Sequence, residues 1–148
     1  MKLYFETPIE KKSDVIIKNF NKDLFLALRP PGIKLSVEKF DGCKTGDEVH
    51  LKIKSFLMTQ TWVSKITQDK LDSNEWSFVD EGVELPWPLK AWKHIHSVKR
   101  VDQNNSLIVD DINFDCFYSW MNYPMKPLLW LSFAVRPSRY KKFFMDKE

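Results

Sequence analysis

Two neighbouring stretches in the second half of the chain show the strict alternation that a β-hairpin requires. The first, Trp92–Arg100, reads W-K-H-I-H-S-V-K-R, and the second, Ser106–Phe114, reads S-L-I-V-D-D-I-N-F. The linker between them contains D-Q-N-N, a composition typical of tight turns. Because successive side chains on a strand point to opposite faces, one face of this hairpin carries a defined set of side chains. We therefore expect an antiparallel pair whose register decides what kind of surface it presents.

A register with Val98 opposite Ile108 brings polar groups together on a largely apolar face. The opposite pairs are then His96 with Asp110, His94 with Ile112, and Trp92 with Phe114. This face combines aromatic and aliphatic groups with two imidazoles and one carboxylate. A mostly apolar lining with a few placed polar groups is typical of a ligand pocket. The hairpin therefore predicts a binding cavity without naming its ligand.

The remaining sequence supplies the other elements of an α+β domain, which we expect to span residues 1–148 as one unit. Apolar and polar residues alternate in several further stretches. Of two short helical stretches, the first runs from Ser13 through Phe20, and the second ends before Arg29, where Pro30 disfavours helical geometry. The expected elements are a strand at 2–9, short helices between 13 and 28, strands at 33–38, 49–54, 59–67 and 76–79, a polar loop at 69–74, irregular chain at 85–88, and a C-terminal helix after Tyr123-Pro124, with Pro127 in its first turn and an interruption at Pro137.

The composition is compatible with a cavity lined by aromatic rings and argues against nucleic-acid binding. The chain has 6 Trp, 11 Phe and 4 Tyr but only 4 Gly, so large rings are available to line a cavity. The net charge is +3, from 23 basic and 20 acidic residues, and the lysines are scattered rather than gathered in a stripe. Nucleic-acid binding is therefore not expected.

Cysteine usage and hydropathy indicate a cytoplasmic protein. Cys43 and Cys116 lack the C-x-x-C spacing, and we expect them to be free thiols in a reducing compartment. The first residues lack the apolar region of a signal peptide. The longest apolar run, Leu128–Val135, is far shorter than the roughly 20 residues of a membrane span, so stable membrane insertion is not expected.

An ordered set of residues carries a family resemblance. The set comprises Arg29-Pro30-Pro31, Trp62 with Ile66-Thr67, Phe78-Val79-Asp80, Trp92-x-His94-x-His96, Asp110 four residues before Phe114, and Tyr123-Pro124 ahead of the C-terminal helix. In this order, from about Leu3 to Phe144, the chain resembles the START/Bet v 1-like superfamily, also called SRPBCC. More narrowly, it is similar to a bacterial branch of small stand-alone members described as ligand-binding or cell-division-inhibitor-like.

The resemblance implies a helix-grip fold, in which a curved seven-stranded antiparallel sheet surrounds a long C-terminal helix and two short helices follow the first strand. It also implies a small apolar or lipid-like ligand held between sheet and helix. Some members of the superfamily catalyse cyclisation or dehydration, and whether this chain is an enzyme stays open here, as does its oligomeric state.

Eight residues are candidate ligand contacts, with the aromatic ones supplying contact area and the others a polar handle. They are Trp76, Phe78, Trp92, His94, His96, Asp110, Phe114 and Trp130. An unpaired buried polar atom costs about 1–3 kcal/mol, so the two histidines and the aspartate would tend to pair with one another. Three interpretations remain open for them: an internal network that stabilises the hairpin, contact with a ligand, or acid–base catalysis in a cyclase or dehydratase.

A metal site is a further alternative, because H-x-H plus a carboxylate is the ligand set of a two-His, one-carboxylate centre. The family resemblance argues against it, and we expect neither a metal nor another cofactor. No G-x-S-x-G elbow or glycine-rich phosphate loop is present that would indicate nucleophilic catalysis or nucleotide binding.

Overall fold

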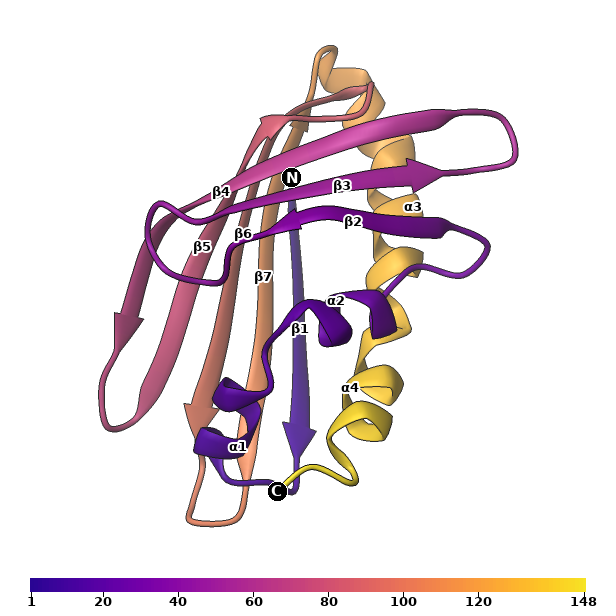
Figure 1. The fold of residues 1–148 in the computed structure, drawn as a ribbon. Coiled ribbons are helices and arrows are strands. Elements are labelled where there is room, and N and C mark those ends of the chain that lie inside the picture. Colours follow the sequence, from indigo (N-terminus) through magenta and orange to yellow (C-terminus); the bar gives the residue numbers. More distant parts are fainter.

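A seven-stranded antiparallel sheet forms most of the molecule and curves around the C-terminal helices (Figure 1). The computed structural model describes residues 1–148. Its elements are β1 (Lys2–Ile9), α1 (Ser13–Lys18), α2 (Lys22–Ala27), β2 (Lys34–Phe40), β3 (Glu48–Lys54), β4 (Thr59–Leu71), β5 (Glu75–Glu84), β6 (Leu89–Arg100), β7 (Ser106–Cys116), η1 (Ser119–Met121), α3 (Asn122–Ala134) and α4 (Arg136–Phe144). The strand order is β1-β7-β6-β5-β4-β3-β2, so the first strand forms one edge of the sheet and pairs with the last strand. The predicted helix-grip architecture is confirmed.

The hairpin of β6 and β7 has the predicted register. Val98 lies opposite Ile108, His96 opposite Asp110, and Trp92 opposite Phe114. All of these side chains are buried, because the sheet curves so that this face points inward. The alternation in the sequence is therefore sufficient to place the two imidazoles on the concave face.

Two strands are longer than their sequence indicates. β4 continues to Leu71 and β5 continues to Glu84, so the polar loop expected over 69–74 is wrong at its start, and only 72–74 form a turn. Leu71 pairs with Trp76 across this turn. The end of β4 is exposed, and an antiparallel sheet tolerates a solvated face, so polar residues there do not signal a strand.

The C-terminal helix is divided at Val135 into α3 and α4. Pro137 lies in the first turn of α4, where its missing N–H has no intrahelical partner to lose, and the predicted interruption is confirmed. The prediction that Pro127 occupies the first turn is wrong. α3 already begins at Asn122, so Pro127 lies inside the helix and Pro124 takes the early position.

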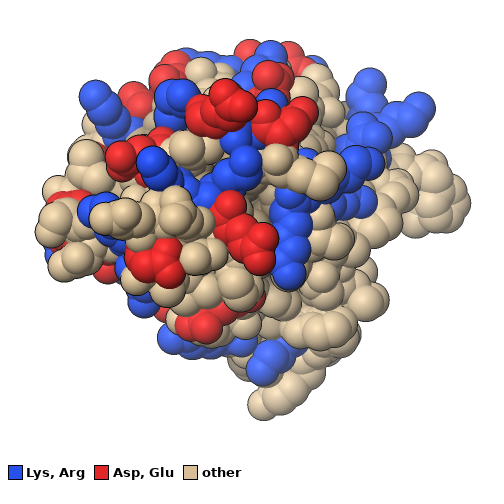
Figure 2. Space-filling model, turned by 90° about the horizontal axis from the view of Figure 1, so that it is seen from below, with Lys and Arg blue, Asp and Glu red and all other residues tan.

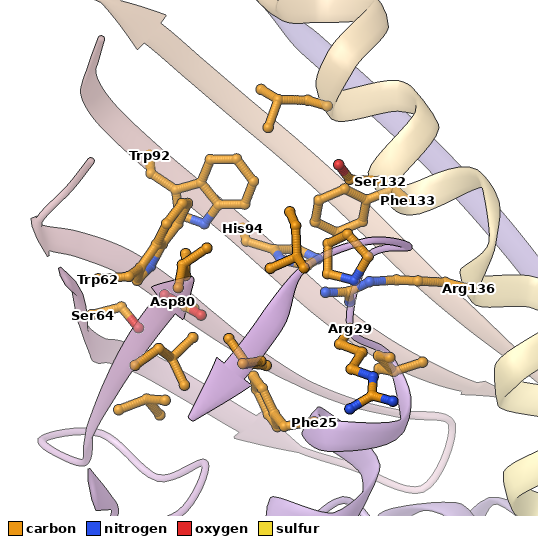
Figure 3. A pocket seen from close by; sticks show the side chains of 18 of the residues that line it. Phe25, Arg29, Trp62, Ser64, Asp80, Trp92, His94, Ser132, Phe133 and Arg136 are labelled. Atoms are coloured by element: carbon orange, nitrogen blue, oxygen red, sulfur yellow. The ribbon is translucent and has the colours of Figure 1, made fainter. Parts of the chain in front are cut away.

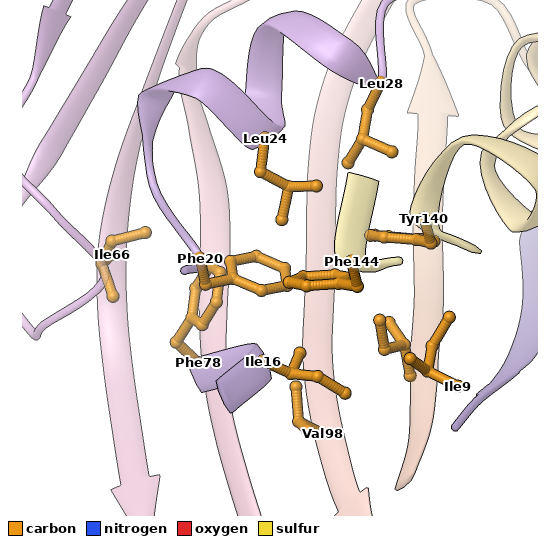
Figure 4. Packing of buried hydrophobic residues seen from close by; sticks show 11 residues of the cluster. Ile9, Ile16, Phe20, Leu24, Leu28, Ile66, Phe78, Val98, Tyr140 and Phe144 are labelled. Atoms are coloured by element: carbon orange, nitrogen blue, oxygen red, sulfur yellow. The ribbon is translucent and has the colours of Figure 1, made fainter. Parts of the chain in front are cut away.

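Two buried clusters hold the helices against the sheet. In the first, Phe20 and Leu24 meet Phe78 of β5 and two aromatic side chains of α4, Tyr140 and Phe144 (Figure 4). The second cluster lies under α3, where Phe133 packs with residues of β1, β6 and β7. None of the helices has the length and apolar character that a membrane crossing requires.

Candidate functional site

A pocket of about 190 Å³ lies between the inner face of α3, the α2–β2 segment and the concave face of the sheet (Figure 3). Its walls are mostly apolar and come from elements far apart in the chain. Strand alternation places Leu35 of β2 and Leu51 of β3 on the wall, and Leu51 lies opposite Trp62 of β4. The Trp62 and Trp92 rings meet edge to face, with centroids 4.9 Å apart.

Residues of α3 and the first residue of α4 close the other side of the pocket. Leu129, Phe133 and Arg136 recur at helical spacing and share one face of the helical segment. The Arg136 side chain is 15% exposed, and its guanidinium lies over the Phe133 ring at 4.1 Å from the ring centroid. The Phe133 ring and the Asp110 carboxylate therefore hold one cation where α3 meets α4.

Asp110 is the centre of a buried hydrogen-bond network. Its Oδ1 lies 2.8 Å from His94 Nε2 and accepts a hydrogen bond from Arg136 Nη1 at 3.2 Å. The Tyr140 hydroxyl donates to Oδ2 at 3.2 Å. Burial by itself raises the pKa of Asp110, but the Arg136 guanidinium and the hydrogen bond from His94 outweigh burial and hold that pKa well below its ordinary value. Asp110 is therefore an ionised and fully partnered group.

His96 lies beside this network without joining it. Its ring stacks between His94, at a centroid distance of 3.5 Å, and Phe78, at 4.4 Å. Nδ1 is 3.7 Å from Asp110 Oδ1, and neither ring nitrogen has a hydrogen-bond partner. Burial lowers the pKa of His96 well below its ordinary value, so its imidazole is neutral at pH 7.

Asp80 of β5 completes the polar floor of the pocket. It lies opposite His94 on the neighbouring strand, and its Oδ2 is 4.0 Å from His96 Nε2. Its other oxygen is buried without a partner. Burial raises the pKa of the Asp80 carboxyl. The floor thus presents an imidazole with a lowered pKa beside a carboxyl with a raised pKa, both short of hydrogen bonds.

The structure divides the eight candidate contacts into two groups. Trp92, His94 and His96 line the pocket, and Asp110 lies directly behind His94. The other four are not among the lining residues: Phe78 is buried beneath His96, Phe114 is in the second core cluster, Trp76 packs edge-on against Phe20, and Trp130 is half exposed. Trp130 follows Leu129 by one position, which turns its side chain about 100° around the helix and away from the pocket.

The expected mutual pairing of the two histidines and Asp110 holds for His94 only. Sequence reasoning does not identify Arg136 and Tyr140, which donate hydrogen bonds to Asp110. It names Asp80 only through the family resemblance. Helical spacing could have placed Arg136 on the pocket-facing side, because Arg136 lies seven residues after Leu129 and three after Phe133.

The position of Arg136 decides against the metal alternative. The nearest ligand atoms of His94, His96 and Asp110 all lie within 4.8 Å of one another. The Arg136 guanidinium, however, already holds the shared carboxylate oxygen at 3.2 Å. A fixed positive charge at this position opposes a second cation, so we assign these residues no metal-binding role.

Comparison with known proteins identifies the fold. No family model matches the sequence, and no curated protein matches it significantly. Among solved structures, norcoclaurine synthase from Thalictrum flavum in complex with dopamine and hydroxybenzaldehyde superposes with a TM-score of 0.69 at 12% identity, covering 99% of this chain and 87% of that one.

Two bacterial structures give similar results. The Zhui aromatase/cyclase from Streptomyces sp. R1128 has a TM-score of 0.59 and 13% identity, over 80% of this chain and 69% of its own. An uncharacterised protein from Bacillus thuringiensis has a TM-score of 0.66 and 16% identity, over 99% and 100%. At these identities the likeness concerns the fold, and the chain has the Bet v 1-like helix-grip fold that the synthase and the cyclase share.

Proposed function

We propose that this protein binds a small, mostly apolar organic molecule in the pocket between α3 and the sheet. The observation that carries the proposal is the set of buried polar atoms on the pocket floor that have no partner: both ring nitrogens of His96 and Oδ1 of Asp80. Each such atom costs about 1–3 kcal/mol if it stays unpaired. A ligand that brings a hydroxyl, carbonyl or amine to this floor recovers part of that cost.

The pocket volume limits the size of the ligand. At about 190 Å³ it is little larger than an engineered cavity of about 150 Å³ that binds benzene. A compound with one or two rings fits this volume, whereas a sterol does not. The complex of norcoclaurine synthase with dopamine and hydroxybenzaldehyde, both single-ring compounds, supports this size class. We therefore favour a small aromatic or alicyclic ligand over a long-chain lipid.

The distribution of apolar and hydrogen-bonding groups in the pocket suggests how such a ligand is oriented. Trp62 and Leu51 offer apolar contact on the outer wall, and His96 and Asp80 offer hydrogen bonds on the floor. The ring system would lie against the tryptophans with its polar substituent directed at His96. The membership in the bacterial branch and the cytoplasmic location remain predictions from the sequence.

Calorimetric titration with 2-naphthol and with naphthalene tests the proposal, because the two probes differ by one hydroxyl group. We expect 2-naphthol to bind about fivefold more tightly, as one additional hydrogen bond of about 1 kcal/mol predicts. Leu51→Trp fills the pocket from a partly buried strand position and should abolish binding of both probes. Leu71→Trp, at the exposed far end of β4, is the matched control.

Failure of both probes to bind would count against the proposal. So would binding that Leu51→Trp leaves unchanged, because the probes would then occupy another surface. Native mass spectrometry of the protein purified from its own host then identifies the natural ligand.

An enzymatic function is the second candidate, and the His96–Asp80 pair is the observation that favours it. At 4.0 Å, a neutral imidazole and a carboxyl of raised pKa can serve as base and acid toward one bound molecule. The chemistry this supports is proton abstraction next to a carbonyl group, the first step of many cyclisations and dehydrations.

Exchange of the α-protons of 2-tetralone in D₂O, followed by NMR, tests this second function. The wild-type protein should accelerate exchange, and Asp80→Asn and His96→Phe should each remove the acceleration. If the wild-type protein binds 2-naphthol but does not accelerate exchange, the binding proposal stands and the enzymatic one fails.

A further inference from the structure

A band of exposed apolar side chains flanks the pocket on two elements. The outer face of α3 carries apolar and aromatic side chains apart from Lys126, because Asn122 is buried at the start of the helix and Ser132 lines the pocket. The turn between β3 and β4 adds three successive apolar residues. We call these residues the apolar rim: Phe56 (96% exposed), Leu57 (76%) and Met58 (56%) in the turn, and Tyr123 (72%), Leu128 (58%), Trp130 (50%) and Leu131 (60%) on α3.

Both parts of the rim lie next to the pocket. Ile53 of β3 and Leu129 of α3 line the pocket, and each is within a few residues of a rim residue. The β3–β4 turn projects beyond α3 on the same side of the molecule (Figure 1). The rim therefore surrounds the side on which α3 and β3 face each other.

The two chain segments that carry the rim contain basic but no acidic residues. No Asp or Glu occurs between Cys116 and Met145, or between Leu51 and Gln68, although the whole chain has 20 acidic residues. Apart from Arg136, which is held by Asp110, these two segments carry seven basic residues: Lys126, Arg139, Lys141 and Lys142 in the first, and Lys52, Lys54 and Lys65 in the second. Figure 2 shows the far right of the molecule with basic and uncharged side chains only, while acidic side chains lie elsewhere on that face.

We propose that the apolar rim is a docking surface for the headgroup region of an anionic lipid bilayer. Tryptophan and tyrosine prefer the boundary between headgroups and acyl chains, where their rings are apolar and their N–H or O–H stays hydrated. Basic residues beside them are attracted to an anionic surface, each contributing to a salt-sensitive association. The rim supplies the first kind of group and the two acid-free segments supply the second.

A second copy of this chain suits the same surface less well. In a symmetric dimer the rim would face its own image, which places two acid-free basic segments against each other without compensating carboxylates. Like charges across an interface oppose association, whereas an anionic bilayer complements them. Docking does not depend on which ligand occupies the pocket. A protein bound to the bilayer in this way would turn the pocket side toward the lipid surface.

Co-sedimentation with sucrose-loaded vesicles tests the proposal. The probes are vesicles of equal parts phosphatidylcholine and phosphatidylglycerol, and vesicles of phosphatidylcholine alone. We expect binding to the anionic vesicles that weakens at least tenfold between about 50 mM and about 500 mM salt, where screening is strong. Binding to the neutral vesicles should be at least tenfold weaker than to the anionic ones at low salt.

Substitutions at the turn separate the rim from net charge. The double variant Phe56→Ser, Leu57→Ser removes two exposed apolar side chains, and its affinity for the anionic vesicles should fall about tenfold or more. The matched control is Leu71→Ser with Val101→Ser, two exposed apolar positions away from the rim, for which affinity should not change. Circular dichroism melting confirms that both variants fold.

Three results would overturn the inference. The first is absence of binding to the anionic vesicles at low salt. The second is equal loss of binding in the rim variant and the control variant. The third is a concentration-dependent dimer, seen by analytical ultracentrifugation and abolished by the rim substitutions, since it would assign the rim to self-association.

Discussion

Replacement of His96 by phenylalanine gives the sharpest test of the polar floor. Phenylalanine keeps a planar ring between His94 and Phe78 but removes two buried nitrogens that have no partner. Replacing an unsatisfied buried polar group with an apolar group of similar shape is close to neutral or stabilising. We therefore expect His96→Phe to change the free energy of unfolding by less than about 1 kcal/mol, or to increase it, at about pH 7.5.

The pH dependence of stability carries the larger signal. The pKa of His96 lies well below 6.5 in the folded protein, while the unfolded chain titrates near 6.5. Below pH 6.5 the unfolded state therefore binds more protons than the folded state, and the free energy of unfolding falls as the pH falls. At 1.36 kcal/mol per pH unit below pH 6.5, the loss through this residue reaches at most about 2 kcal/mol at about pH 5. His96→Phe lacks this loss.

Urea unfolding of both proteins across this pH range measures the difference directly, because titrations shared by the two proteins cancel. The stability of the variant relative to the wild type should increase as the pH falls below about 6.5, by at most about 2 kcal/mol at about pH 5. His94→Phe is the contrasting control: it removes the 2.8 Å contact to Asp110 and should cost about 1–3 kcal/mol at neutral pH. A constant difference between His96→Phe and wild type across the pH range, or a loss above about 2 kcal/mol at pH 7.5, would refute the reasoning.

Further predictions concern the network around Asp110. Tyr140→Phe removes one hydrogen bond to a buried carboxylate and should lower the free energy of unfolding by about 1.5–3 kcal/mol in urea titrations; no change would mean that the hydroxyl does not bond in solution. Arg136→Met removes the cation that most opposes protonation of Asp110, so the midpoint of acid unfolding should move to higher pH, whereas an unchanged midpoint would contradict that role. Stoichiometric Zn²⁺ followed by EDTA should leave the melting temperature unchanged, and a chelator-reversible rise would restore the metal alternative.

Local sequence determined the fold and half of the candidate site. In the β6–β7 hairpin a period of two over about ten residues leaves a single register that buries the apolar set, and a slip by one residue would expose it. Alternation alone therefore places Trp92, His94 and His96 on the concave face, and all three lie on the pocket wall. The helix break near Pro137 likewise follows from local backbone chemistry.

Only the tertiary structure decided which polar groups pair and which do not. Arg136 and Tyr140 come to Asp110 from 26 and 30 residues further along the chain, and they satisfy the carboxylate. Both ring nitrogens of His96 and Oδ1 of Asp80 are left without a hydrogen-bond partner. The rotation of α3 likewise leaves Trp130 outside while Phe133 turns inward. Periodicity states which residues share a face, but not which face meets the sheet. That choice depends on packing across the whole molecule, where contacts between distant residues compete for the same buried space.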